Sequence, residues 1–262
     1  VYELNSKVKK NEGKQYKLNE YEKVEDYERN IPDLSGFFGD AKDHTQVFIT
    51  GASLSSIYSL GILEQIQDRN LDVFYIKPDT ELLTGVPLLV ENTVFGILQE
   101  YARSGKLKSF TIFSNENIEK IHSSINLKTY YDTLNETIYS SVHYLNYFEH
   151  TEPHIGNMSK PSNISRIRTV GMLDMKKLDE KWLYDLDMER ELCYYMCINE
   201  ERLEKETGLH KKLVDTLKTK PRNAYRKISY AIYETPLPDF GFCVAHTNAI
   251  QQQKTLDKLG QE

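Results

Sequence analysis

Several residues with catalytic potential lie close together early in the chain. Asp43 and His44 precede a short apolar run, and several serines follow it, as in some hydrolases. The Gly-x-Ser-x-Gly turn that presents a nucleophilic serine in α/β hydrolases does not occur in the sequence. The pattern therefore gives no support for a serine hydrolase.

Histidines near the middle of the chain are the candidates for metal ligands. His143 and His150 are seven residues apart and would share one face of a helix, and His154 follows them. Only Glu149 and Glu152 supply acids nearby, and their spacing does not complete a metal site. We expect exposed or capping histidines and no metal.

The three cysteines also lack the paired spacing of a metal site. Cys193 and Cys197 lie in an apolar run typical of a strand, and Cys243 lies in another, so we expect buried free thiols. Free thiols suit a reducing compartment, and we expect a cytoplasmic protein, or a virion component if it is viral. No stretch has the ~18 consecutive apolar residues of a membrane span.

Charge and length limit the classes of partner. The chain has 262 residues and a formal charge of −6, which favours a folded protein with no general attraction to nucleic acid or to an anionic membrane. The most basic stretch, from Lys211 to Arg226, is typical of a solvated helix face. Neither a membrane nor direct contact with nucleic acid is therefore expected.

The apolar pattern of the first half predicts alternating strands and helices around a long central helix. Residues 46–50, 71–76 and 109–113 are expected as buried strands, and residues 88–101 as a helix whose packed side carries Leu89, Thr93, Gly96, Ile97 and Tyr101. Strand, helix and strand in about 30 residues predict a parallel βαβ unit. From 129 to 150, apolar residues recur every three or four positions, which predicts a helix buried between two layers.

The second half of the sequence begins with a stretch that lacks apolar periodicity. Residues 151–163 contain Pro153, Gly156 and Pro161 and predict a loop. Strands are expected at 192–199, 224–234 and 241–246, with the last two as antiparallel neighbours, and a helix is expected at 209–220. We therefore predict an α/β domain over 1–124, a central helix over 125–150 and a smaller α+β domain over 151–262 with a polar tail.

This order of elements resembles the tubulin/FtsZ superfamily, including its phage and plasmid members. Val73–Pro78 (VFYIKP) is similar to a family strand that ends in Lys-Pro. Phe110–Lys120 (FTIFSNENIEK) is similar to the family's strand and Asn loop. Ile167–Val170 (IRTV) is similar to the start of the helix after the catalytic loop. The resemblance implies a tubulin/FtsZ-like fold with a truncated parallel-sheet nucleotide-binding-type domain.

The resemblance also locates a phosphate loop that has lost its glycines. The family pattern Gly-Gly-Gly-Thr-Gly-[Ser/Thr]-Gly leaves backbone N–H groups bare for phosphate. The corresponding stretch here runs from Thr50 to Ser56, retains Gly51, and has Ala52, Ser53, Leu54 and Ser55 at positions of the motif. We expect the Leu54 side chain to project where phosphate would lie. A second Gly-rich loop, expected before residue 46, does not occur in the sequence.

The remaining positions implied by the resemblance concern the base and hydrolysis. Asn115 matches the family's guanine-contacting Asn, and Tyr131 with Asn135 matches the aromatic and polar pair of the central helix, although each also has an ordinary structural explanation. Family members hydrolyse GTP with two acids from a neighbouring subunit. When the chain is aligned on Ile167–Thr169, those positions hold Asn163 and Arg166, so catalysis is not expected.

Three functions remain open. The first is a non-catalytic, tubulin-like structural or assembly protein (a pseudo-GTPase without GTP or GDP). The resemblance implies that its partners are proteins, either further copies of the chain or different subunits. A composition rich in Asn, Lys, Tyr and Ile and a first residue other than Met favour a phage virion component within this class. The alternatives are a divergent filament-forming GTPase for DNA segregation or positioning, and a regulator that caps such a filament.

Overall fold

The structure is a computed structural model that describes residues 1–8, 13–123, 125–220 and 226–252. The side chains of Leu54, Ser55 and Asn157 are outside this description. The chain divides into two compact units: unit 1 contains residues 1–111 together with those from 250 onward, and unit 2 contains residues 112–249.

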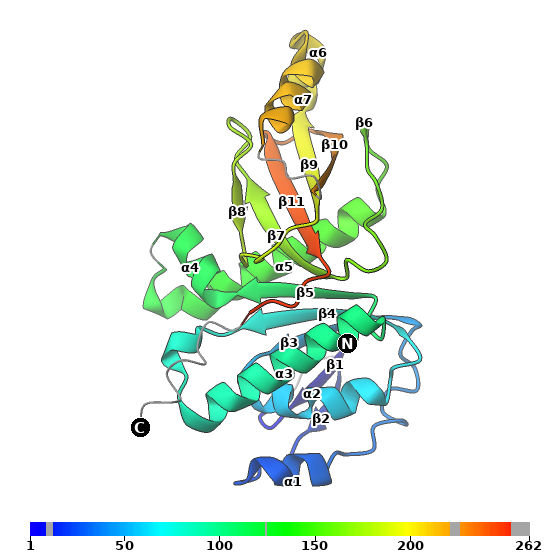
Figure 1. Cartoon of the computed structure of the whole chain (residues 1–262), viewed down its shortest axis with the longest axis vertical. Helices are drawn as coiled ribbons and strands as arrows, with labels where there is room; N and C mark the ends of the chain where they lie inside the picture. The colour runs from blue at the N-terminus through cyan, green and yellow to red at the C-terminus, as the bar shows by residue number, and fades with distance from the viewer. Residues whose placement is uncertain (9–12, 124, 221–225, 253–262) are drawn as a thin grey trace. The chain divides into compact units, whose positions relative to one another are not determined.

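Unit 1 contains the first strands of the large sheet, a two-stranded parallel sheet (β1-β2) and the helices α1, α2 and α3 (Figure 1). Its elements are β1 (Tyr2–Asn5), β2 (Lys14–Lys17), α1 (Val24–Arg29), β3 (His44–Thr50), α2 (Leu54–Glu64), β4 (Asn70–Lys77), a 3-10 turn (Thr80–Leu82), α3 (Gly85–Ser104) and the start of β5 (Ser109–Ser114). β3 and β4 run parallel, as the βαβ pattern predicted, and β5 lies on the other side of β4. Among the described residues β3 has one strand partner, β4, so it is an edge strand of the sheet.

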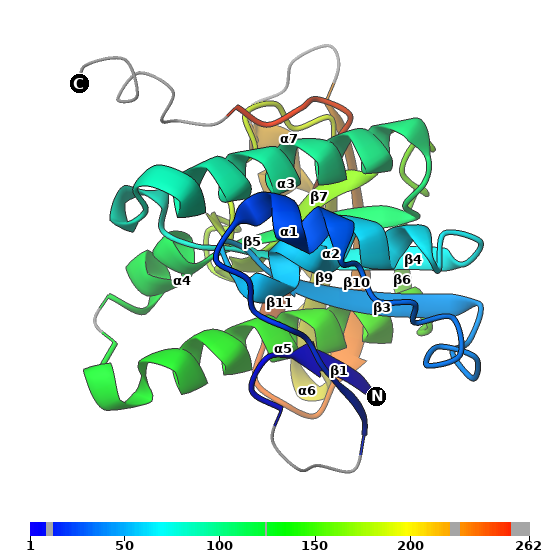
Figure 2. The ribbon, with the colours of Figure 1, turned by 90° about the horizontal axis from the view of Figure 1, so that it is seen from below.

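Helices α2 and α3 lie side by side on one face of β3 and β4 (Figures 1 and 2). α3 contains the predicted helix and is three residues longer at each end, but its predicted face is wrong, because Leu89 is 60% exposed. The buried face instead carries Val94, Phe95 and Leu98 together with two polar residues, Glu91 and Gln99. The apolar pattern missed this face because buried polar residues occupy part of it.

The start of the C-terminal tail is attached to α3. The backbone N–H of Gln251 donates to Gln99 Oε1 at 2.6 Å, and both side chains are buried. The expected polar tail therefore begins with a packed residue in unit 1, and its remainder from residue 253 lies outside the described residues. Residues 35–40 form turns, and Leu34 and Phe38 are buried.

Unit 2 is built on a mixed sheet with the strand order β7-β11-β9-β10-β6. Its elements are the end of β5, α4 (Asn115–His122), a 3-10 turn (Leu127–Thr129), α5 (Tyr130–Glu149), β6 (Ile155–Asn157), β7 (Ile167–Leu173), β8 (Glu180–Trp182), β9 (Glu191–Asn199), α6 (Glu200–Lys205), α7 (Leu209–Thr219), β10 (Lys227–Thr235) and β11 (Phe240–Thr247). The long helix α5 agrees with its predicted bounds to within a residue at each end, but its predicted burial between two layers is wrong, because Tyr131 and Tyr139 are 75% and 73% exposed.

Three expectations for this unit are wrong. Ile167–Val170 begins a strand, β7, and not a helix. The last two strands are not neighbours, because β11 lies between β7 and β9 and is antiparallel to both. β10 instead pairs with β9 in parallel and with β6, a short strand within the expected loop. β-Branched residues at the start of β7 fit a strand better than a helix, and pairing across a crossover leaves no local sequence signal.

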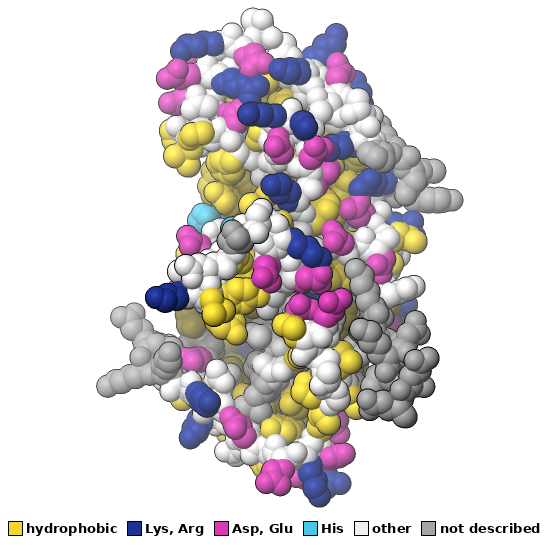
Figure 3. Space-filling model, turned by 90° about the vertical axis from the view of Figure 1, so that its left-hand side faces the viewer, with side chains coloured by type: hydrophobic (Ala, Val, Ile, Leu, Met, Phe, Trp, Pro, Cys, Tyr) yellow, Lys and Arg dark blue, Asp and Glu magenta, His cyan; other side chains and the backbone are white. Residues whose placement is uncertain are grey.

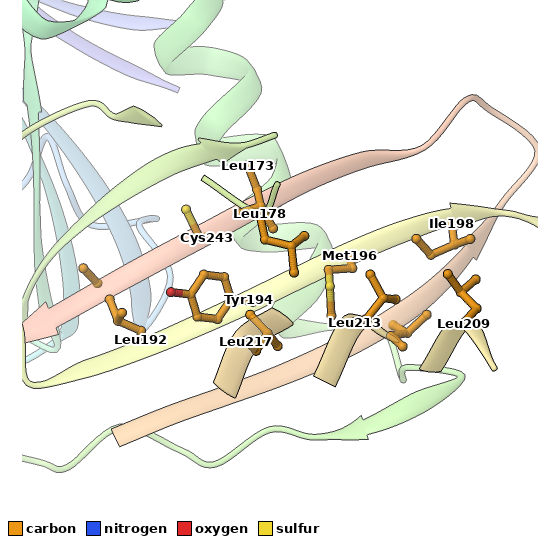
Figure 4. Packing of buried hydrophobic residues seen from close by; sticks show 12 residues of the cluster. Leu173, Leu178, Leu192, Tyr194, Met196, Ile198, Leu209, Leu213, Leu217 and Cys243 are labelled. Carbon is orange, nitrogen blue, oxygen red and sulfur yellow. The ribbon is translucent and has the colours of Figure 1, made fainter. Parts of the chain in front are cut away.

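Helices α5 and α7 cover opposite faces of this sheet. Phe148 of α5 stacks on Tyr195 with ring centroids 4.6 Å apart and also contacts Tyr233 and Phe242. On the other face, leucines of α7 pack on alternate residues of β9 (Figure 4). The buried members of this cluster that Figure 4 labels are Leu173, Leu178, Leu192, Tyr194, Met196, Ile198, Leu209, Leu213, Leu217 and Cys243.

The basic residues of α7 lie among acids. Lys218 pairs with Asp215 at 3.2 Å, and Lys220 pairs with Glu180 at 3.2 Å. In the upper part of Figure 3, where α6 and α7 lie, basic and acidic side chains are interspersed. The described part of the stretch from Lys211 is thus a solvated helix face with ion pairs, and residues 221–225 lie outside the described residues.

Candidate functional site

The loop between β3 and α2 lies where the sequence placed a degenerate phosphate loop. The Ser53 Oγ accepts a hydrogen bond from the N–H of Ser56, and the Ser56 Oγ accepts one from the N–H of Ser53, which forms a capping box. The Gly51 N–H donates to the carbonyl of Ile76 at 2.9 Å. Three N–H groups of the loop are therefore satisfied by the chain itself.

Gly51 packs against a buried polar cluster that the sequence analysis missed. A Cβ added to Gly51 would lie 2.6 Å from the Tyr75 hydroxyl and 2.7 Å from Pro78 Cδ, and it would also clash with the carboxylate of Glu91. Glu91 accepts a hydrogen bond from the Tyr75 hydroxyl at 2.6 Å and pairs with Lys77 at 3.1 Å. The one retained glycine is thus required by protein packing, and a carboxylate lies beside it.

Burial and the neighbouring carboxylate keep the Tyr75 hydroxyl protonated. Desolvation is the main cause, and together with the charge of Glu91 it raises the pKa of Tyr75 well above its usual value. The Lys77 ammonium lies 4.4 Å from the ring centroid of Phe95, in cation–π range. Tyr75, Lys77 and Glu91 therefore form a closed structural cluster.

Ala52 has a backbone conformation that favours glycine. Its φ is +50°, in the left-handed region, which costs a residue with a Cβ roughly 1 kcal/mol. The chain thus has a tight turn at this position without the glycine that would relieve its strain. The effect expected of Leu54 and the role of Ser55 depend on side chains outside the described ones, so they stay predictions.

Asn115, the expected base contact, begins α4 directly after β5. Its Oδ1 is buried and has no hydrogen-bond partner among the residues that the structure describes. A buried acceptor without a donor is costly, so this oxygen is a candidate for a bound donor group.

Tyr131 and Asn135 lie one turn apart on an exposed face of α5. Tyr131 is 75% exposed, and Asn135 is also exposed. Within unit 2 these two side chains share one helix face, as their spacing predicts. Asn115 and α5 belong to unit 2, whereas the loop at Gly51 belongs to unit 1.

Asn163 and Arg166 lie in the segment between β6 and β7. They were assigned to catalytic positions through an alignment in which Ile167 started a helix, and that helix is replaced by β7. The chain passes from α5 to β7 with only the short strand β6 between them. The geometry thus removes the basis for that alignment, while the absence of any Asp or Glu from 153 to 171 remains a fact of the sequence.

The early histidine belongs to a polar cluster around the buried carboxylate of Asp72. His44 Nε2 lies 2.5 Å from Asp72 Oδ2, and the Ser109 hydroxyl donates to the other oxygen of Asp72. Lys108 pairs with the same buried carboxylate at 3.2 Å. Because Asp72 lies between His44 and Ser109, the imidazole is not placed to activate the serine as a nucleophile.

The three cysteines are free and buried. Desolvation raises the pKa of Cys197 to about 12 and also raises the pKa values of Cys193 and Cys243, so their thiols stay protonated. No group of three or more potential metal ligands occurs among the described residues. No helix among them is long and apolar enough to cross a membrane.

These elements define a protein of the tubulin/FtsZ fold type: a parallel βαβ unit, a strand ending in Lys-Pro, an Asn turn after β5 and a long helix before a mixed sheet. The comparison with solved structures agrees. TubZ of Bacillus thuringiensis serovar israelensis, in a GTPγS-form protofilament, superposes with a TM-score of 0.58 at 9% identity, over 86% of this chain and 69% of that chain.

A second similar structure is CetZ from Methanosaeta thermophila, with a TM-score of 0.57 at 11% identity over 82% of this chain and 64% of that chain. A two-stranded TubZ filament gives 0.56 at 9% identity, over 86% of this chain and 63% of that chain. No family profile and no curated protein sequence matches the chain. The likeness confirms the predicted fold, and the chain spans about two thirds of the length of these structures.

Proposed function

We propose that this chain is a tubulin-fold assembly protein that does not turn over GTP and acts through contacts with other protein subunits. Further copies of the chain are the first partners to consider, because the similar TubZ structures are a protofilament and a two-stranded filament. Head-to-tail contact between identical subunits produces filaments or closed rings.

The arrangement around Gly51 is the main observation in support of a chain that does not bind nucleotide phosphate at this loop. Phosphate needs bare N–H groups and positive potential. Here the N–H groups of Gly51, Ser53 and Ser56 have acceptors within the chain, and the carboxylate of Glu91 packs against Gly51. Displacing these contacts would cost protein hydrogen bonds and place two anions together.

Exposed tyrosines on α5 support action through a protein surface. Tyr131, Tyr139 and Tyr147 are 75%, 73% and 44% exposed. His143 lies between the last two and stacks on Tyr147 with ring centroids 6.5 Å apart. Tyrosines are enriched in interfaces because they combine a large apolar area with a polar hydroxyl.

The direct test combines calorimetric titration of GTP and GDP with the light-scattering mass of the same sample. We expect no nucleotide binding at the β3–α2 loop and a mass above that of one chain. Binding of GTP or GDP with a dissociation constant below about 10 μM, roughly −7 kcal/mol, would refute the loss of the phosphate loop if two controls agree. Ser53→Ala in the loop should weaken such binding, and Lys160→Gln/Lys227→Gln, a double variant in unit 2, should leave it unchanged. A single-chain mass at all concentrations, with no complex with another protein, would refute the assembly role.

The surface part of the proposal has its own matched variants. Tyr131→Ser/Tyr139→Ser removes two exposed rings, while Leu82→Ser removes an exposed apolar side chain from unit 1. We expect the tyrosine variant to lower the assembled fraction at least tenfold and the leucine variant to leave it unchanged. Equal assembly by both variants would place the contact elsewhere than on α5.

A second candidate function is nucleotide binding without hydrolysis, favoured by the buried Asn115 Oδ1. A purine N–H could satisfy this oxygen. Asn115→Asp should then change the preference between guanine and adenine nucleotides, whereas an unchanged preference would remove this candidate.

Within the assembly role, a phage virion component or a filament cap in the cytoplasm are finer alternatives, which mass spectrometry of purified particles would distinguish.

A further inference from the structure

A hollow of about 600 Å³ lies within unit 2, at the end of the sheet where β9 and β10 begin. The segment between β6 and β7 forms one wall, and the strand ends form the other. Its lining residues are Lys160, Ser162, Ile164, Ser165, Arg190, Glu191, Lys227 and Asn248. This volume falls within the range of about 300–1,000 Å³ that is typical of small-molecule sites.

The lining is strongly cationic for a chain of net charge −6. Lys160, Arg190 and Lys227 are positive, and Glu191 is the acidic residue of the lining. The lining thus has a charge of about +2, which attracts anions over distances of about a Debye length.

A row of four residues, one on each of four neighbouring strands, brings a further cation towards the hollow. In register, Arg168 of β7 pairs with His246 of β11, His246 with Glu191 of β9, and Glu191 with Lys227 of β10. Residues in register share one face of a sheet, so the four side chains lie on the same face. Arg168 therefore adds a cation to the face that carries the hollow.

Glu191 has a structural task that explains its place among the cations. Its carboxylate is buried, and Oε1 accepts a hydrogen bond from the backbone N–H of Ser162 at 2.6 Å. The N–H of Ser165 donates to the carbonyl of Ser162 at 2.8 Å and closes a turn. The acid thus holds residues 162–165 over the strand ends and gives the hollow its wall.

We propose that this hollow binds the phosphate group of a small molecule, with Arg190, Lys160 and Lys227 as its cationic contacts. Guanidinium and ammonium groups are the usual side-chain partners of phosphate, and the hydroxyls of Ser162 and Ser165 and the amide of Asn248 supply neutral donors. A concave site of this size fits a phosphorylated metabolite or a nucleotide, whereas a duplex needs an extended basic surface.

The site is independent of the β3–α2 loop, because all its lining residues belong to unit 2. Nucleotide binding to the whole chain would therefore have two separable sources. Variants of the hollow and of the loop distinguish them, so failure of this proposal is distinct from failure of the proposed function.

The test is calorimetric titration of the full chain with pyrophosphate, GTP and glucose 6-phosphate as separate probes. The variant Lys160→Gln/Lys227→Gln changes two exposed lysines, and Lys205→Gln/Lys218→Gln removes the same charge from α6 and α7 as a matched control. We expect at least one probe to bind with a dissociation constant below about 1 mM. Binding should be at least tenfold weaker in the first variant and unchanged in the control.

Three results would overturn the proposal. The first is that no probe binds at millimolar concentration. The second is equal weakening by both double variants, which would mean general electrostatics and not a site. The third is binding that Ser53→Ala abolishes and the hollow variants retain, since that binding would belong to the β3–α2 loop.

Discussion

His246 should make the stability of unit 2 fall as the pH falls. Its side chain is buried between Arg168 of β7 and Glu191 of β9, at the centre of the cross-strand row. Desolvation, followed by the charge of Arg168, lowers its pKa from 6.5 to about 3, and a hydrogen bond with the backbone of Ser165 opposes this only in part. The folded chain therefore keeps this imidazole neutral.

The sign of the effect follows from proton binding. Below pH 6.5 the unfolded chain takes up a proton at this histidine while the folded chain does not, so protonation favours unfolding. The stabilisation that the neutral His246 contributes is present above about pH 6.5 and is lost progressively as the pH falls towards 3. Between about pH 7.5 and pH 4.5 the loss from this one group amounts to about 2.5 kcal/mol.

The assay is urea unfolding at several pH values, followed by the fluorescence of Trp182, the single tryptophan, which lies in unit 2. His246→Gln retains a hydrogen-bonding side chain and removes the titration, so its stability should vary less over this range by about 2.5 kcal/mol. His150→Gln, at the exposed end of α5, is the control and should keep the wild-type slope. Parallel pH profiles of the wild type and His246→Gln would refute the reasoning.

Three further predictions concern the buried polar cluster and the thiols. Gly51→Ala should cost about 2–3 kcal/mol in chemical unfolding because its Cβ meets packed side chains, whereas Gly36→Ala, with open space around it, should cost less than about 1 kcal/mol. Glu91→Gln should cost about 3 kcal/mol because it removes the charge partner of the half-buried Lys77 at a fully buried position, and Glu100→Gln in a surface pair should cost less than about 1 kcal/mol. Equal costs within either pair would contradict this account. The three buried cysteines should react with a thiol reagent only at the rate of unfolding; fast reaction in the folded state would show that they are accessible.

The sequence predicted the elements whose apolar pattern is local. The strands β3, β4 and β5 are short apolar runs, and α5 repeats its apolar residues every three or four positions, so each was located to within about two residues. The order of these elements was enough to identify the fold type. Local periodicity and order therefore account for the successful half of the prediction.

The failures share a different cause, because they concern partners distant in sequence. Glu91 is buried because Tyr75 and Lys77 receive its carboxylate, and no helical periodicity reports such a pairing. The position of β11 between β7 and β9 is likewise set by long-range pairing. The cationic hollow joins the segment around Lys160 to strand ends more than 25 residues away, so it was also missed.

The position of β3 at the edge of the described sheet has a consequence for how the protein behaves during synthesis and purification. An edge strand is a template on which another strand can pair, and Phe48 on this strand is 52% exposed. Natural edge strands usually carry charge, proline or a bulge that discourages such pairing. The sequence of β3, HTQVFIT, carries neither Lys nor Pro. Insolubility on overexpression would therefore begin at this strand, and co-expression with a chain that covers the edge would be the remedy.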